Sequence, residues 1–439
     1  MNDMLAKNLS AMTETVFINE KKRPFDEVRA ISELVVSDED IKDASVRLLR
    51  FAPFIRKVFP QTEETDGIIE SPIEKIDNTK KALCDEFGCE ILGDLYIKLD
   101  SHLKVAGSVK ARGGFYEVLK HAEDLVLEAG VVLPDENREV FASQKVKSFL
   151  SDYTVQVGST GNLGMSIGIM SAVLGFKVII HMSSDAKEWK KALLRSYGVT
   201  VMEYDTDYTQ AVANGRKNSD LDEKSYFVDD EKSVDLFLGY AVAAERLKKQ
   251  LDERGISVSK ERPLIVYLPA GVGGAPGGIG YGLKRLFGDD VHLFFVEPTL
   301  FPSVIYGIAS QKHEKASVRD LGINGTTSAA DGLACPSPSG FVTRMMTNHL
   351  SGGFTVSEGA LYDYLRLFYK SENIKIEPSA CAGFEGVRRL SEYDETKKYL
   401  EENGISREIL KNATHIVWAT GGSLVPDDVF DKYLNTFEN

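Results

Sequence analysis

The chain has few cysteines and no long hydrophobic run. Four cysteines, at 84, 89, 335 and 381, match neither a disulfide framework nor paired C-x-x-C zinc spacing, so we expect free thiols. No stretch approaches the roughly 18 apolar residues of a membrane-spanning helix. The first twenty residues also lack the apolar core of a signal peptide, and we therefore expect a cytoplasmic protein with no membrane partner.

Positive charge is also scarce. The 439 residues contain 52 Lys+Arg against 66 Asp+Glu, which gives a formal net charge of −14 with histidine neutral. No Lys/Arg-rich block opposes this average field locally, and a phosphate backbone would be repelled by it. The composition therefore disfavours nucleic acid as a partner and by itself indicates no chemistry.

Short β-branched runs alternate with helical stretches along most of the chain, which predicts an α/β fold with parallel sheets covered by helices. The first hundred residues are expected to be mainly helical, with one helix over 37–58; further helices are expected over 115–127 and 236–254. Strands are expected near 90–99, 153–159, 176–182, 199–205, 225–230, 263–271, 291–298 and 415–422. We expect two domains with a cleft between them, a large one from 1–111 and 236–439 and a small one from 112–235.

Two glycine-containing turns follow predicted strands, S-T-G-N-L-G at 159–164 and G-V-G-G-A-P-G-G at 271–278. Exposed backbone amides in the second turn, followed by a helix start near Ile279, are typical of a phosphate-binding loop. Pro276 replaces the last glycine of the dinucleotide motif, and no Lys-Ser/Thr pair follows Gly278 as a Walker loop requires. A tight turn needed only for packing is the alternative interpretation.

Lys110 lies in the segment S-V-K-A-R-G-G at 108–114, which we expect to be a loop before a helix. A solvated surface lysine is the ordinary interpretation. A lysine that attacks a carbonyl instead needs burial or nearby positive charge to favour its neutral form, and Arg112 is two residues away.

These motifs, together with A-A-D-G-L-A at 329–334 and W-A-T-G-G-S at 418–423, resemble the fold-type II (tryptophan synthase β-like) family of pyridoxal-phosphate enzymes. The resemblance runs in order along nearly the whole chain. Within the family it is closest to the bacterial D-serine dehydratases, the D-serine ammonia-lyases. It implies two parallel-sheet domains, a site in the cleft between them and a monomer.

The resemblance also implies a role for each matching residue. Lys110 would bind the cofactor covalently as a Schiff base and move a proton, with Thr160 as a second catalytic residue on the opposite face of the ring. Cofactor contacts are implied for Asn162, Gly271, Val272, Gly273, Gly274, Ala275 and Thr420, and substrate contacts for Ser159, Thr160 and Gly161. Ala275 departs from the family pattern, in which this position is glycine. No metal ligand is expected, although some members use a monovalent cation, for which Glu297 and Asp331 are weak candidates.

The implied reaction is β-elimination of D-serine to pyruvate and ammonia, with D-threonine as a further substrate. A dehydratase of L-serine or L-threonine, or a serine racemase, is the alternative within the fold. An alternative of another class is a phosphate- or nucleotide-binding module without chemistry. His181 and His415 lie in apolar predicted strands and are expected to be core residues rather than bases.

Overall fold

The protein is described by a computed structural model covering residues 1–159, 161–184, 186–205, 208–325 and 327–437. The chain forms two compact units. The larger unit comprises Met1–Asp38, Ser71–His102 and Ala243–Asn439, and the smaller unit comprises Glu39–Glu70 and Leu103–Val242. The domain limits expected at 111/112 and 235/236 stay a prediction.

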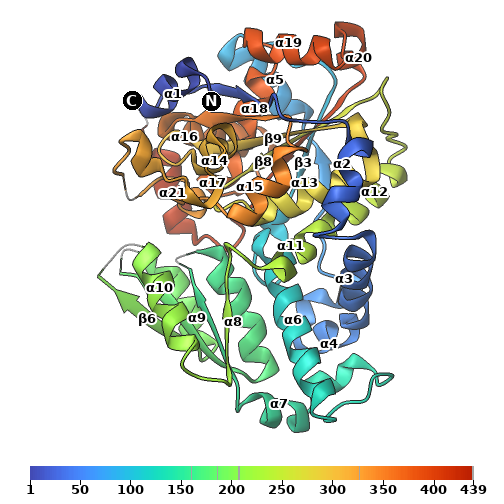
Figure 1. The fold of residues 1–439 in the computed structure, drawn as a ribbon, viewed down its shortest axis with the longest axis vertical. Coiled ribbons are helices and arrows are strands. Elements are labelled where there is room, and N and C mark those ends of the chain that lie inside the picture. Colours follow the sequence, from blue (N-terminus) through green and yellow to red (C-terminus); the bar gives the residue numbers. More distant parts are fainter. Residues whose placement is uncertain (160, 185, 206–207, 326, 438–439) are drawn as a thin grey trace. The chain divides into compact units, whose positions relative to one another are not determined.

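A seven-stranded sheet forms the centre of the larger unit, in the order β1-β10-β9-β8-β11-β3-β2. Figure 1 labels three of its strands, β9, β8 and β3. The outermost pairs, β1 with β10 and β2 with β3, are antiparallel, and the five inner strands run parallel. The strands are β1 (Val16–Ile18), β2 (Ile73–Lys75), β3 (Asp94–Lys98), β8 (Leu264–Pro269), β9 (Val291–Pro298), β10 (Gly352–Val356) and β11 (Thr414–Trp418). β8 to β11 are buried along their whole length, as expected for strands covered on both faces.

Helices cover both faces of this sheet. Gly280 of α13 approaches the Leu268 side chain and Gly386 of α18 approaches the Tyr267 ring. Successive residues of a strand point to opposite faces, so these two helices lie on opposite sides of β8. The helices of this unit are α1 (Asp3–Ser10), α2 (Phe25–Glu33), α5 (Asp77–Phe87), α12 (Ala243–Glu253), α13 (Gly274–Phe287), α14 (Ser303–Ser310), α15 (Gly340–Thr347), α16 (Glu358–Glu372), α17 (Pro378–Cys381), α18 (Gly383–Arg389), α19 (Asp394–Glu402), α20 (Arg407–Lys411) and α21 (Asp427–Asn435). Short 3-10 helices are η2 (Asp100–His102), η4 (Gly288–Asp290), η5 (His313–Lys315), η6 (Val318–Leu321) and η7 (Asp331–Leu333).

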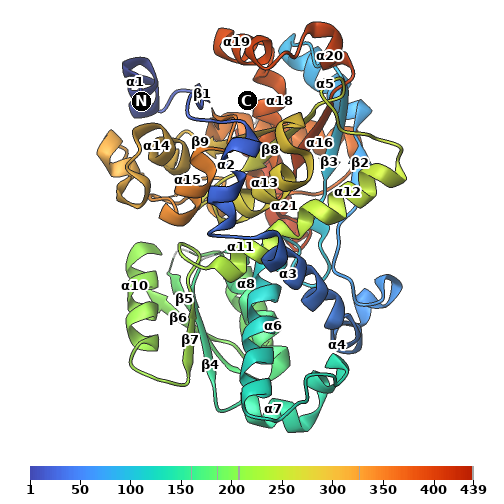
Figure 2. The ribbon, with the colours of Figure 1, turned by 45° about the vertical axis from the view of Figure 1, so that its right-hand side comes forward.

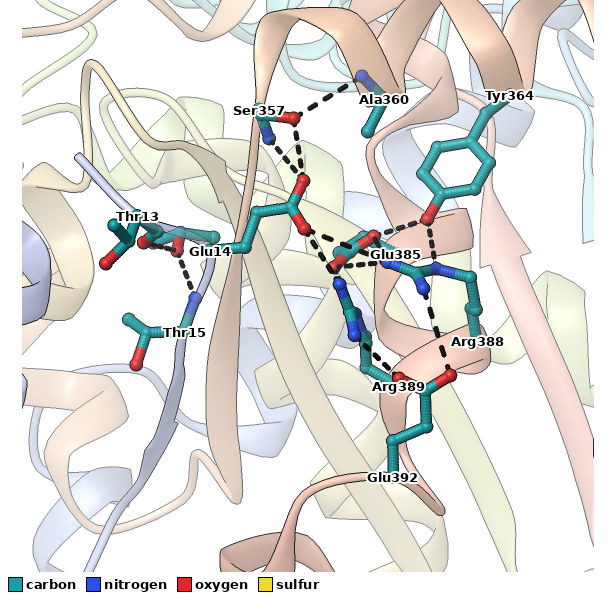
Figure 3. A network of polar contacts seen from close by, with 11 residues as sticks. Thr13, Glu14, Thr15, Ser357, Ala360, Tyr364, Glu385, Arg388, Arg389 and Glu392 are labelled. Atoms are coloured by element: carbon teal, nitrogen blue, oxygen red, sulfur yellow. Dashed lines mark hydrogen bonds and ion pairs between the residues drawn. The ribbon is translucent and has the colours of Figure 1, made fainter. Parts of the chain in front are cut away.

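A buried ion network attaches the N-terminal segment to this unit (Figure 3). Glu14 accepts a hydrogen bond from Arg389 (Nη2 to Oε2, 2.9 Å) and another from the Ser357 hydroxyl (2.7 Å). Arg389 also bonds Glu385 of α18 through Nε (3.0 Å), and Arg388 bonds the same carboxyl group through Nη2. The charges are paired and hydrogen-bonded, which is the condition under which buried ions are tolerated.

The smaller unit contains a four-stranded parallel sheet in the order β6-β5-β4-β7 (Figure 2). Its strands are β4 (Thr154–Gly158), β5 (Lys177–Ser183), β6 (Thr200–Tyr204) and β7 (Ser225–Val228). α6 packs against α8 and α11, and α10 packs on β4 and β5. The helices are α3 (Asp38–Arg50), α4 (Ala52–Val58), α6 (Lys110–Glu128), α7 (Gln144–Leu150), α8 (Asn162–Leu174), α9 (Glu188–Ser196), α10 (Tyr208–Ser219) and α11 (Val234–Ala241), with 3-10 helices η1 (Pro60–Thr65) and η3 (Arg138–Ala142).

The parallel sheets agree with the sequence prediction, and several element limits do not. The predicted helix 37–58 is interrupted at Phe51, and the predicted helix 236–254 is interrupted at Val242. β1, β2 and β10 were not predicted. The helix after the glycine loop begins at Gly274 rather than near Ile279, because glycine without a Cβ lets the chain turn directly into the helix. All four cysteines are free, as predicted.

None of the helices in the described part of the chain combines the length and the apolar character needed to span a bilayer.

Candidate functional site

In the larger unit, the glycine loop and Thr420 are carried to one edge of the sheet. β8 and β11 are parallel neighbours, paired from Leu264 with Thr414 onwards. Gly271 follows the carboxyl end of β8, and Thr420 follows the carboxyl end of β11. Parallel sheets bind ligands outside the carboxyl ends of their strands, so these two loops are brought together where a ligand site is expected.

The glycine loop requires glycine at two positions. Gly273 has φ +112°, a left-handed conformation that L side chains rarely adopt, and it is the residue before the first turn of α13. A Cβ at Gly271 would lie 3.0 Å from the carbonyl oxygen of Gly332. Ala275 lies in the first turn of α13, where an alanine is conformationally acceptable. Its departure from the family pattern therefore introduces no backbone strain.

The beginning of α13 favours an anion. The first amides of an α-helix have no partner within the helix, and the helix dipole places partial positive charge there. Gly277 donates to the Gly273 carbonyl (2.8 Å) and closes the first turn. The Val272 carbonyl accepts from the Ser339 amide (2.8 Å), which orients the loop. A bound phosphate is the ligand to which such an end is suited.

Thr420 has a buried hydroxyl group with no hydrogen-bond partner among the described residues, and the residue is 9% exposed. Backbone hydrogen bonds hold the residues on both sides of Thr420. The Ala419 carbonyl accepts from the Ser101 amide (2.8 Å), and the Gly421 carbonyl accepts from the Glu377 amide (3.0 Å). Buried polar groups without a partner are rare in native proteins, and a ligand is one of the explanations. The hydroxyl is thus fixed at the sheet edge with its hydrogen-bonding capacity unused.

Lys110 lies in the smaller unit and is the first residue of α6 rather than part of a loop. Its side chain is only 18% exposed, unlike a solvated surface lysine, and Nζ donates to Asp230 Oδ2 (3.0 Å). Nζ also lies 5.9 Å from the centre of the Tyr240 ring. Arg112 is not an uncompensated positive charge near Lys110, because its guanidinium is paired with Glu70.

The Ser-Thr-Gly-Asn turn follows β4 of the same unit. The Ser159 hydroxyl oxygen accepts from the amides of Gly161 (3.3 Å) and Gly164 (3.0 Å), so this side chain shapes the turn. Asn162 is the first residue of α8. Thr160, expected to be catalytic and to bind substrate, lies outside the described residues. β4 and β7 are parallel neighbours, so this turn and the Asp230 segment leave the same edge of their sheet.

The remaining singled-out residues have structural partners. His181 and His415 are buried, as predicted, and burial lowers the pKa of both imidazoles, that of His415 to about 4. Glu297 accepts from the Val304 and Ile305 amides (2.8 and 2.7 Å) at the start of α14, and burial raises its pKa to about 8. Asp331 accepts from the Gly332 amide. Within the described ranges, no group of three or more His, Cys, Asp and Glu residues is placed to hold a metal ion.

No pattern in the sequence singled out Asp230 or Tyr240, which lie close to the Lys110 amine. The only signal for Asp230 is an acidic pair after a β-branched run, which is common at strand ends. Tyr240 lies in an apolar helical stretch, and burial raises the pKa of its hydroxyl group while the Lys110 amine beside it acts in the opposite direction. Gly113 permits this approach, because a Cβ there would lie 2.6 Å from the Tyr240 ring.

Comparison with known proteins identifies the family. The family model described as pyridoxal-phosphate dependent enzyme matches residues 65–400. The chain belongs to this family of pyridoxal-phosphate dependent enzymes. The match includes Lys110 and the glycine loop, and it ends before Thr420.

Two relatives of this pyridoxal-phosphate enzyme match it over nearly its whole length. A protein of Fusobacterium nucleatum named "Probable D-serine dehydratase" is 56% identical over 437 residues, which cover 100% of this chain and 98% of the relative. A Bacillus cereus protein of the same name is 52% identical over 429 residues, with 98% and 95% covered. Among solved structures, diaminopropionate ammonia lyase from Escherichia coli in complex with D-serine has a TM-score of 0.69 at 15% identity and covers 96% of this chain and 97% of that one. This likeness shows a shared fold.

Proposed function

We propose that the protein is a D-serine ammonia-lyase, which removes water from D-serine by β-elimination and releases pyruvate and ammonia. The observation that carries the proposal is identity of 52% and 56% over essentially the whole chain with two proteins named for that activity. The matches run over nearly the whole chain, so they span the segments that carry Lys110 and the glycine loop. In this fold the loops at the strand ends form the site.

The described residues fit pyridoxal phosphate. The start of α13, with Gly271 to Ala275, would hold the phosphate through backbone amides. The unpartnered hydroxyl of Thr420 would receive the ring nitrogen as its hydrogen-bond partner. Lys110 supplies a largely buried amine for the covalent bond. Bound there, the cofactor supplies the electron sink that makes loss of the α-proton feasible.

Lys110 and Asp230 carry the proton chemistry that we propose. The carboxylate is within hydrogen-bonding distance of the amine, so it holds Nζ in place when the lysine is not bonded to cofactor. A free Lys110 amine can take the α-proton or return a proton, depending on which face of the substrate is presented. For a D-substrate the opposite face is presented, and Thr160 remains our second candidate there.

We propose that the turn after β4 contributes to substrate binding. Gly161 precedes the first turn of α8 and the Ser159 hydroxyl group lies beside it, so the positive end of the helix dipole suits a carboxylate group. We propose that this turn binds the D-serine carboxylate and that Asn162 contacts the cofactor ring. Turnover of D-threonine, use of a monovalent cation, a monomeric state and a cytoplasmic location stay predictions.

Product formation from pure enantiomers tests the proposal. With D-serine, cofactor-loaded protein is expected to produce pyruvate and ammonia in equal amounts. L-serine is expected to give far less. Faster pyruvate formation from L-serine would favour the L-dehydratase alternative, and conversion of one enantiomer into the other would favour a racemase. Protein that takes up no pyridoxal phosphate would favour a binding module without chemistry.

A further inference from the structure

Glu117 is a buried carboxyl group on the same helix as Lys110. The two residues lie about two turns apart on one face of α6. Glu117 is 1% exposed, and its two oxygens accept hydrogen bonds from different parts of the chain: the Tyr226 hydroxyl donates to Oε1 (2.8 Å) and the Ser233 hydroxyl donates to Oε2 (2.6 Å). Burial raises the pKa of Glu117 to about 8, and the nearby carboxylates of Asp235 and Asp230 act in the same direction.

The two hydroxyl groups stand on either side of Asp230. Tyr226 belongs to β7, and Ser233 caps the beginning of α11 by accepting from the Leu236 amide (2.9 Å). The turn between them is closed by its own hydrogen bonds, since the Lys232 and Ser233 amides both donate to the Asp229 carbonyl (3.1 and 2.9 Å). The segment 226–233 is therefore a compact turn attached to α6 at both ends through Glu117.

We propose that Glu117 is a positioning residue that holds the 226–233 segment on α6, so that the Asp230 carboxylate meets the Lys110 amine. The inference rests on the proposed role of Lys110. One carboxyl group accepts both hydrogen bonds, and the same helix carries the lysine. Glu117 thereby fixes the position of Asp230 relative to Lys110 without contacting either the substrate or the reacting atoms.

A second carboxyl group on α6 provides the matched control. Glu123 is as buried as Glu117, but its partners are Arg47, Arg50 and Arg138, and it makes no hydrogen bond to the 226–233 segment within the described residues. A general loosening of α6 should follow from a change at either residue. A change in the reactivity of Lys110 that depends on Asp230 should follow only from a substitution of Glu117.

The experiment measures acetylation of Lys110 by limiting acetic anhydride at pH 8 in the full chain freed of cofactor, with peptide mass spectrometry as the readout. Without a carboxylate partner the amine loses the charge that favours its protonated, unreactive form. Glu117→Ala is expected to speed the labelling by up to about tenfold, the range that one lost hydrogen bond can produce. Tyr226→Phe and Ser233→Ala should each give part of this change.

Three comparisons decide the outcome. Asp230→Asn should speed labelling, and adding Glu117→Ala to it should have no further effect, because both act on the same contact. Glu117→Gln should stay close to wild type, since the amide can accept from Tyr226 and donate to Ser233. Glu123→Ala, the matched substitution at the other end of the helix, should leave Lys110 labelling unchanged in the folded protein.

Equal labelling in wild type and Glu117→Ala overturns the proposal, as does an effect that persists in the Asp230→Asn background or that Glu123→Ala reproduces. If Glu117→Ala does not fold, Tyr226→Phe and Ser233→Ala carry the same test. The readout needs neither cofactor nor turnover. Failure of the proposed function, seen as cofactor uptake by Lys110→Ala equal to that of wild type, is therefore a separate result.

Discussion

α6 carries two buried carboxyl groups, Glu117 and Glu123, whose surroundings shift their pKa values in opposite directions. Near the C-terminal end, burial acts to raise the pKa of Glu123, but hydrogen bonds from Arg50, Arg47 and Arg138 outweigh it and lower the pKa to about 2. Near the Lys110 end, burial raises the pKa of Glu117 to about 8, and hydrogen bonds from the hydroxyls of Ser233 and Tyr226 only partly oppose the shift. Three guanidinium groups hold Glu123 as an anion, whereas burial shifts Glu117 toward its protonated form.

The difference distinguishes two uses of buried polar groups. Around Glu123, as in the Glu385 network of the larger unit, charges are matched by opposite charges, and the arrangement ties segments together. At the end of β11 the protein instead leaves the buried hydroxyl group of Thr420 without a partner among the described residues. The paired charges serve the fold, whereas an unpartnered hydroxyl group at a strand end is available to a ligand.

The largest effect is expected from breaking the paired cluster. Arg138→Ala removes a 2%-exposed guanidinium that bonds Glu123 and the carbonyl of Glu136, and should lower the free energy of unfolding by about 3 kcal/mol. Denaturant unfolding measures this. Cofactor uptake per folded molecule should stay unchanged, and a loss of uptake with intact stability would reverse the roles that we assign to the two ends of α6.

The pH dependence of the free energy of unfolding distinguishes Glu117 from Glu123, and Glu117→Gln tests it. The folded-state pKa of about 8 lies above the ordinary carboxyl value of 4.5, so between these values the folded protein binds one more proton than the unfolded chain. The contribution of Glu117 to the free energy of unfolding is fully present below pH 4.5. It decreases by about 1.4 kcal/mol per pH unit as the pH rises toward 8. Glutamine has no proton to lose, so the stability of wild type relative to Glu117→Gln should fall from pH 5 to pH 8 and level off above.

Unfolding free energies of both proteins at several pH values provide the measurement. Glu297 has a similarly raised pKa, but it is present in both proteins and its contribution cancels. A stability difference that does not change with pH would mean that Glu117 is ionised in the folded protein, as Glu123 is.

Thr420→Val should have effects of opposite sign on stability and activity. Removing a buried hydroxyl group that has no partner among the described residues should raise the stability of the cofactor-free protein by about 1 kcal/mol. Turnover of D-serine should fall about tenfold, because the proposed hydrogen bond to the cofactor ring is lost. A loss of stability in the cofactor-free variant would show that Thr420 has a structural partner.

The sequence predicted the buried parallel strands best, because each is a short β-branched run with turn residues after it. It also placed the glycine loop and Thr420 correctly after β8 and β11. β10 was missed since it begins with Gly352 and Gly353, which are typical of turns. β1 and β2 have three residues each, too few for an alternating pattern to appear.

The partners of Lys110 were not predictable. Asp230 is 120 residues away along the chain, and Glu117 meets Tyr226 and Ser233 only after α6, β7 and α11 have packed. No local pattern encodes such contacts. Resemblance to a family indicated the lysine itself, but the Asp230 carboxylate that pairs with it becomes visible only in the folded structure.

We propose that Lys110 carries the chemistry of a D-serine ammonia-lyase. Pyruvate formation from pure D-serine by wild type and Lys110→Ala, each saturated with pyridoxal phosphate, tests it most directly. The account predicts rapid formation by wild type and a rate lower by at least about a thousandfold in the variant, because a nucleophile used in every turnover is missing. Equal rates in the two proteins, or no pyruvate from wild type, would contradict it.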